Sequence, residues 1–247
     1  IGISLGISGK IENSNLFLSF MNLKHRADYG IGVYNFYDET LYRRYLIGQD
    51  DYFRLREREL GMLFIYRYPF SRFTRMEFDS QLYYVKQEWD YLAPVDVPTE
   101  NWQMNISKDT DTVIAPGLAF VFDNALFGST GPMVGWRYYY LIRKSFAKNE
   151  LNYFTNYFDL RCYNFFEKRY SLAFRLNAGI STGESPQRFT LDGLYGVRAL
   201  NEDIDGERMV LGSAELRFPF FDYISIAFPV PLQLRNIRGS IFADIGA

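Results

Sequence analysis

The feature that most constrains this chain is a segment at residues 209–218, in which one set of alternate positions is free of charge. The even positions from Val210 to Phe218 carry no ionisable side chain, whereas Ser213, Glu215 and Arg217 lie among the odd positions. Successive side chains of a β-strand point to opposite faces, so the segment predicts a strand with one apolar and one ionic face. A soluble β-sandwich or barrel would bury the apolar face, whereas a membrane β-barrel turns it outward to lipid.

The same alternation recurs along the chain, in about eleven strand-like segments. An arginine on the lipid-facing side near the bilayer midplane costs about 2–4 kcal/mol. Residues 170–180 illustrate the expected arrangement, with Leu172, Phe174 and Leu176 facing lipid and Arg175 facing a polar lumen. Arginines lie opposite the apolar set in the other segments as well, at Arg67, Arg75, Arg137, Arg161 and Arg217.

Composition separates the membrane interpretation from the soluble one. Aromatic residues make up 19% of the 247 residues, and the mean hydropathy is −0.19. No window approaches 18 uninterrupted apolar residues, which argues against a transmembrane helix. A soluble all-β protein predicts the same alternation, but with shorter strands and fewer bulky aromatics on one face. Aromatics in close succession, such as Trp136, Tyr138 and Tyr140, suit an interfacial girdle, so we predict an all-β, antiparallel transmembrane β-barrel in contact with membrane lipid.

Other site chemistries have little support in the sequence. The only histidine, His25, stands between Lys24 and Arg26 in a short polar turn, and a triad or a histidine metal site would have to use it. The single cysteine, Cys162, shares the apolar side of its strand and cannot form an intrachain disulfide. A net charge of −2 argues against a nucleic-acid partner. We therefore expect no catalytic residue, no metal and no cofactor.

The connections between the predicted strands alternate in length. Short ones near 24–28, 68–72 and 165–168 alternate with long ones near 38–53, 88–111, 143–152 and 181–207. Outer-membrane barrels have short periplasmic turns and long external loops, which places the long connections outside. Both chain ends fall in strand-like runs. We expect residues 1–247 to be part of one outer-membrane β-barrel domain whose N-terminal periplasmic region and final strands are absent.

The longest connection contains Val197-Arg198-Ala199-Leu200; Glu215 follows in Ala-Glu-Leu-Arg-Phe-Pro, and Asp244 in Phe-Ala-Asp-Ile-Gly. These segments resemble the bacterial surface antigen family, the BamA/TamA superfamily of outer-membrane assembly and translocation barrels. The resemblance covers residues 150–247 well and is loose before them. In that family the sixth external loop folds into the lumen through a Val-Arg-Gly-aromatic motif, whose arginine meets acidic residues on the following strands.

The resemblance implies that Arg198 docks inside the barrel against Glu215, Asp244 or both. Ala199 and Leu200 replace the family's glycine and aromatic residue, and a departure from the family geometry is expected there because Ala tolerates φ > 0 poorly. Aligned on this loop, the chain would supply strands three to thirteen of sixteen. Residues 218–246 also resemble the subgroup whose barrel follows a periplasmic β-propeller.

Two classes of function remain open from the sequence. The first is an outer-membrane barrel for protein translocation or membrane insertion, with unfolded outer-membrane or secreted proteins as substrates and with periplasmic or accessory subunits. The alternative is a passive pore, or a membrane anchor for a missing periplasmic domain. An outer-membrane hydrolase is a distant third, and we expect the chain not to be an enzyme.

Overall fold

The computed structural model describes residues 2–6, 14–46, 49–92, 103–128, 131–167, 169–193, 196–198, 200, 203–227 and 229–247. Every regular element within these ranges is a β-strand. A helix with the length and apolarity needed to cross a membrane does not occur in this part of the chain.

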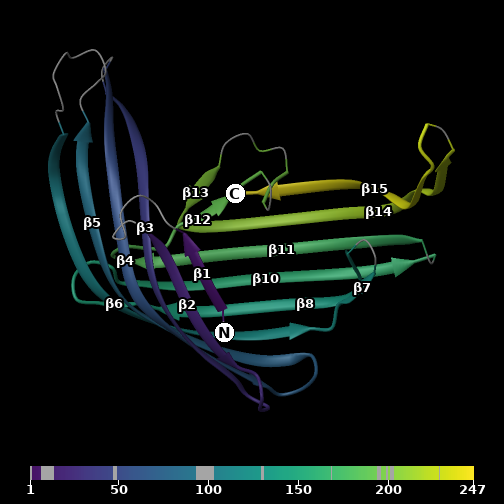
Figure 1. Cartoon of the computed structure of the whole chain (residues 1–247), viewed down its shortest axis with the longest axis horizontal. Coiled ribbons are helices and arrows are strands. Elements are labelled where there is room, and N and C mark those ends of the chain that lie inside the picture. The colour runs from purple at the N-terminus through teal and green to yellow at the C-terminus, as the bar shows by residue number, and fades with distance from the viewer. Residues whose placement is uncertain are drawn as a thin grey trace. The chain divides into compact units, whose positions relative to one another are not determined.

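Within the described ranges the main antiparallel sheet has thirteen strands, and eleven of them follow the order β1-β2-β3-β4-β5-β6-β8-β10-β11-β14-β15 (Figure 1). These eleven match the expected number of about eleven. Their bounds are β1 (Gly2–Gly6), β2 (Asn15–Asn22), β3 (Asp28–Leu46), β4 (Gln49–Pro69), β5 (Thr74–Leu92), β6 (Gln103–Asp123), β8 (Gly131–Lys144), β10 (Tyr153–Phe166), β11 (Tyr170–Gly183), β14 (Arg208–Ile226) and β15 (Leu232–Gly246). The short strands β7 (Leu126–Gly128) and β9 (Phe146–Ala147) pair with β8 and β6, and β12 (Phe189–Leu191) pairs with β13 (Ile204–Gly206) in a separate two-stranded sheet.

The first of two compact units comprises residues 1–68, 78–117 and 144–152. Its strands alternate in exposure as the sequence predicts. On β4, Leu60, Met62 and Phe64 are exposed, whereas Gly61 between them is buried. The Tyr34 ring of β3 covers Gly61, where a Cβ atom would lie 2.5 Å from the ring. The opposite face is thus packed by an aromatic side chain that needs a glycine beneath it.

The second unit comprises residues 69–77, 118–143 and 153–247. On β11, Phe174 and Leu176 are exposed while Ala173 and Asn177 are buried. Register places Arg161 of β10 opposite Arg175 of β11. The same transverse row continues to Ser213 of β14 and Asp244 of β15. Four adjacent strands therefore bring polar side chains to one face of the sheet, as alternation requires.

The prediction of a long connection at 38–53 is wrong. β3 runs to Leu46 and β4 starts at Gln49, with ladder pairing from Asp28↔Arg67 to Leu46↔Gln49. The alternation fades in this hairpin because both faces carry polar side chains, while the backbone hydrogen bonds that define a strand continue. The 88–111 connection is also shorter than predicted, because β5 continues to Leu92 and β6 begins at Gln103.

Candidate functional site

The connection between β11 and β14 packs on one face of β14, which we call the loop-bearing face; it carries Met209, Leu211, Ser213 and Glu215. Leu191 of β12 forms a buried apolar cluster with Met209 and Leu211. Tyr157, Phe189 and Val197 pack against this cluster. The sequence pattern predicted an ionic face here. The face is instead apolar at Met209 and Leu211, where the loop covers it.

Two glycines of the sheet make room for the loop. A Cβ atom at Gly179 would lie 2.6 Å from the ring of Phe189, and a Cβ atom at Gly246 would lie 2.7 Å from Cγ2 of Val197. At separations below 3.0 Å the neighbouring side chain would have to shift. The loop therefore approaches β11 and β15 closely at these two positions, which is a common reason for glycine in a strand.

Short-range backbone hydrogen bonds shape the segment that carries Arg198. The Gly196 amide donates to the backbone oxygen of Asp192 at 3.2 Å and to its Oδ1 at 3.0 Å. The Leu200 amide donates to the Val197 carbonyl at 3.1 Å, closing a turn around Arg198. Ala199, where a departure from the family geometry was expected, lies outside the described residues.

Arg198 binds both carboxylates that the sequence named for it. Its Nε donates to Asp244 Oδ2 at 2.8 Å and its Nη2 to Asp244 Oδ1 at 2.9 Å, a two-pronged pair. Its Nη1 donates to Glu215 Oε2 at 3.0 Å, and its backbone amide donates to Asp244 Oδ2 at 3.2 Å. The planar guanidinium suits this arrangement, because its donors point in fixed directions toward two acceptors. The Asp244 and Glu215 carboxylates raise the pKa of Arg198 above its ordinary value.

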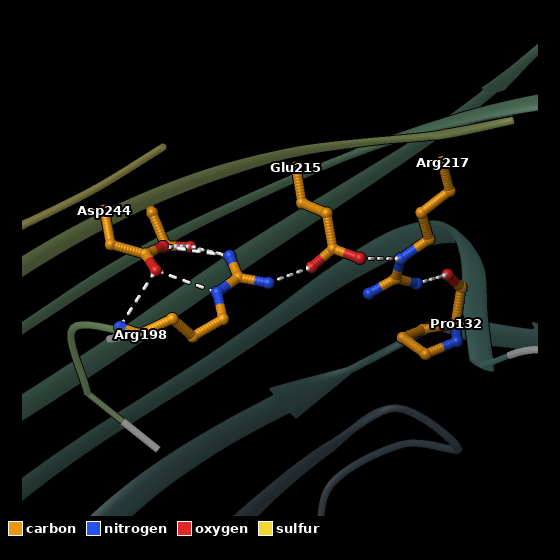
Figure 2. Close-up of polar contacts among 6 residues, drawn as sticks. Pro132, Arg198, Glu215, Arg217 and Asp244 are labelled. Carbon is orange, nitrogen blue, oxygen red and sulfur yellow. Dashed lines mark hydrogen bonds and ion pairs between the residues drawn. The ribbon is translucent and has the colours of Figure 1, made fainter. Parts of the chain in front are cut away.

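The cluster extends beyond these three residues, as Figure 2 shows with Glu215 between two guanidiniums. Arg217 Nε donates to Glu215 Oε1 at 2.8 Å, and Arg217 Nη1 donates to the Pro132 carbonyl at 3.1 Å. The Asp244 side chain is only 3% exposed, whereas that of Arg198 is 29% exposed. The acceptor is thus buried in the wall, while the donor reaches it from the loop.

Sequence reasoning missed two residues that touch Arg198. Ser213 Oγ donates to Asp244 Oδ1 at 2.6 Å and accepts from Arg198 Nη2 at 3.2 Å. The Arg198 guanidinium also stacks 3.6 Å above the centre of the Phe242 ring, a cation–π contact. Both residues share the alternation of Glu215 or Asp244 on their strands, a signal that places them on the same face but does not single them out. We call Arg198, Ser213, Glu215, Phe242 and Asp244 the loop clamp.

A second ionic cluster lies within the sheet on the same face. Asp159 accepts two hydrogen bonds from Arg161, at 2.9 and 2.8 Å, and one from Arg175 at 3.1 Å. Asn177 donates to the hydroxyl of Tyr157 at 2.6 Å. We call Asp159, Arg161 and Arg175 the wall cluster, because all three belong to β10 and β11.

The other candidate positions do not join the clamp. His25 is exposed in the turn between β2 and β3, and Cys162 is a free, half-buried cysteine on β10. Within the described ranges, no group of three or more His, Cys, Asp or Glu side chains is placed to hold a metal ion. The clamp consists of a cation held by two anions, an arrangement that fixes a loop in place.

Comparison with known proteins supports the fold. No family model and no curated protein sequence matches the chain. Among solved structures, it is similar to BamA from Haemophilus ducreyi, in a crystal structure lacking POTRA domains 1-3, with a TM-score of 0.66 and 14% sequence identity. The match covers 94% of this chain and 49% of that one, so the chain spans about half the length of the solved chain that it matches. The likeness confirms an all-β, antiparallel β-barrel fold that is present in part.

Proposed function

We propose that this chain is part of a bacterial outer-membrane β-barrel of the protein assembly and translocation type. The observation that carries the proposal is the loop clamp, in which Arg198 from a long connection is held on the sheet by Asp244 and Glu215. The fold likeness to BamA supports it at the level of architecture. We also propose that the chain is related to the bacterial surface antigen family, and within it to the subgroup whose barrel follows a periplasmic β-propeller.

Exposed apolar side chains support the membrane location. Leu60, Met62, Trp136 and Leu176 are each at least 45% exposed, and they lie on strands whose opposite face carries charge. Soluble monomers rarely expose contiguous apolar patches of more than a few hundred Å². In a bilayer the same side chains face lipid, and the arginines on the other face line a polar lumen.

The clamp suggests how the loop contributes to an assembly barrel. Arg198 binds Glu215 on β14 and Asp244 on β15 at the same time, and these strands are neighbours in the sheet. A loop held by both strands braces their pairing from inside. An assembly barrel has to keep its wall intact while unfolded outer-membrane or secreted proteins engage it, with or without accessory subunits.

A reconstitution experiment tests the proposal. The intact protein is inserted into liposomes, and the folding rate of a urea-denatured outer-membrane protein is measured by its heat-modifiable band. We expect the intact protein to accelerate folding and Arg198→Ala to remove most of the acceleration, while Arg169→Ala, which breaks an exposed ion pair with Asp222, leaves it unchanged. Ion conductance without accelerated folding would contradict the proposal and identify a passive pore.

A further inference from the structure

An apolar hollow of about 480 Å³ lies on the face of β14 opposite the loop clamp. Register explains its shape: Ala214 lies between Phe174 and Ala243, and Gly212 lies between Leu176 and Ile245. The small residues at these positions leave a depression beside Phe174, Leu176 and Ile245. Its volume falls in the range of ~300–1,000 Å³ typical of small-molecule sites.

A positively charged side chain lies beyond one end of the hollow, farther along the same face of β14. Arg208 shares the outward alternation of Val210 and Gly212, and it lies four residues from Gly212, roughly 13 Å along the strand. The exposed Arg208 side chain lines a second hollow, of about 510 Å³, together with Arg188, Gly206 and Glu207.

The charge balance of this second hollow favours an anion. Arg188 donates one hydrogen bond to the backbone carbonyl of Asp205, which leaves its charge uncompensated by that contact. The Asp205 carboxylate accepts from Thr190. Among the lining residues that the structure describes, Glu207 is the one carboxylate and two are arginines.

We propose that this surface binds a membrane lipid with an anionic, phosphate-bearing headgroup. The phosphate contacts Arg208 and Arg188, because guanidinium groups bind phosphate oxygens in paired hydrogen bonds. One acyl chain runs along Val210 into the hollow above Gly212 and Ala214. The inference rests on the proposed membrane location, and it adds a specific lipid site to a face that would otherwise contact lipid without selectivity.

Native mass spectrometry of the intact protein in neutral detergent tests the site, with phosphatidylglycerol as the probe and diacylglycerol of the same chains as the phosphate-free comparison. We expect selective retention of phosphatidylglycerol. Arg208→Gln should weaken it about tenfold, the loss of one charge-assisted contact. Ala214→Leu, which fills the hollow, should weaken both the charged and the uncharged lipid. Arg235→Gln removes the same charge from β15 at an exposed position away from the hollow and should have no effect.

Two results would overturn the lipid site. Equal retention of the two lipids, or an unchanged affinity in Arg208→Gln, would remove the headgroup contact. If inorganic phosphate displaced phosphatidylglycerol completely, the site would be a simple anion-binding site to which the acyl chain contributes nothing.

A separate measurement distinguishes failure of this site from failure of the proposed function. A fluorophore at Leu118→Cys, in a Cys162→Ser background, reports on the exposed face of β6 in liposomes with brominated acyl chains. Quenching there together with absent headgroup selectivity overturns the lipid site alone. Absence of quenching overturns the membrane location and the lipid site together.

Discussion

The loop clamp and the wall cluster lie on the same face of the sheet and use the same chemistry, yet they differ in what positions them. In the wall cluster, Asp159 binds Arg161 two residues away on its own strand and Arg175 on the neighbouring strand. Strand register fixes both distances. In the loop clamp, Arg198 belongs to a connection and binds Glu215 and Asp244, which lie 17 and 46 positions later in the sequence. Strand pairing alone brings the residues of the wall cluster together. The loop clamp also requires that the connection between β11 and β14 docks on the sheet.

This difference predicts different consequences when each cluster is broken. A carboxylate buried with an arginine stabilises a structure only while both partners remain, because an unpaired buried charge is costly. Loss of the wall cluster should weaken β10–β11 and leave the loop in place. Loss of the loop clamp should release the loop and leave the ladders of the sheet paired.

The largest effect is expected for Asp244→Ala. It removes the acceptor of three hydrogen bonds from Arg198 and one from Ser213, and breaking such a buried pair costs about 3–5 kcal/mol. The partial exposure of Arg198 places the expected loss at the lower end of this range. The temperature at which the intact protein loses its heat-modifiable form measures it. Asp222→Ala, at an exposed ion pair with Arg169, is the control and should change little.

Asp159→Ala should cost somewhat less, about 2–3 kcal/mol, because Arg161 and Arg175 are more exposed than Asp159 and regain some water. Proteinase K digestion of the 181–207 loop tests the comparison itself. The loop should be cut no faster than in the unaltered protein, while hydrogen exchange in β10 and β11 should increase. Faster cleavage of the loop would show that the two clusters are coupled.

Gly246→Ala probes the apolar contact between the loop and β15. The added Cβ would collide with Cγ2 of Val197, and overpacking of this kind typically costs about 1–3 kcal/mol. We expect faster proteolysis of the loop with the Arg198 ion pairs retained. Gly206→Ala adds a Cβ whose nearest neighbour lies at 3.2 Å, and it serves as the milder control. Equal behaviour of the two variants would show that Val197 is not packed against Gly246.

Glu215→Gln should have the smallest effect, about 1 kcal/mol. The amide oxygen can still accept from Arg198 or Arg217, and the bonds between Arg198 and Asp244 remain. Thermal stability should fall less than in Asp244→Ala. A loss equal to that of Asp244→Ala would mean that Glu215, and not Asp244, is the principal anchor of the loop.

Much of the sheet could be predicted, because a strand with one apolar face shows alternating apolar and polar residues in its sequence. In β11 the alternation of Phe174 and Leu176 with Ala173 and Asn177 appears in the sequence and again in the exposure of the side chains. Where both faces are polar the signal disappears. This is why the sequence predicted a connection at 38–53, although β3 continues to Leu46.

The site was predicted in outline and missed in detail for a related reason. Alternation placed Glu215 and Asp244 on one face, but only the family resemblance indicated that a loop would bring Arg198 to them. Ser213 and Phe242 lie on the same face, and nothing local distinguishes them from other side chains there. Their role depends on where a distant loop rests, which strand periodicity does not encode.

The most direct test of the account is a cross-link between the loop and the wall. Val197→Cys and Gly246→Cys are introduced into a Cys162→Ser background, because Val197 Cγ2 lies 2.7 Å from the position of a Cβ at residue 246, a spacing suited to a disulfide. The register pair Asn164→Cys and Leu172→Cys in the sheet is the positive control for oxidation. If the loop docks as described, both pairs form disulfides in the intact protein, and Arg198→Ala slows formation of the first pair only. A reaction of the control pair without any cross-link between residues 197 and 246 would contradict the docked loop.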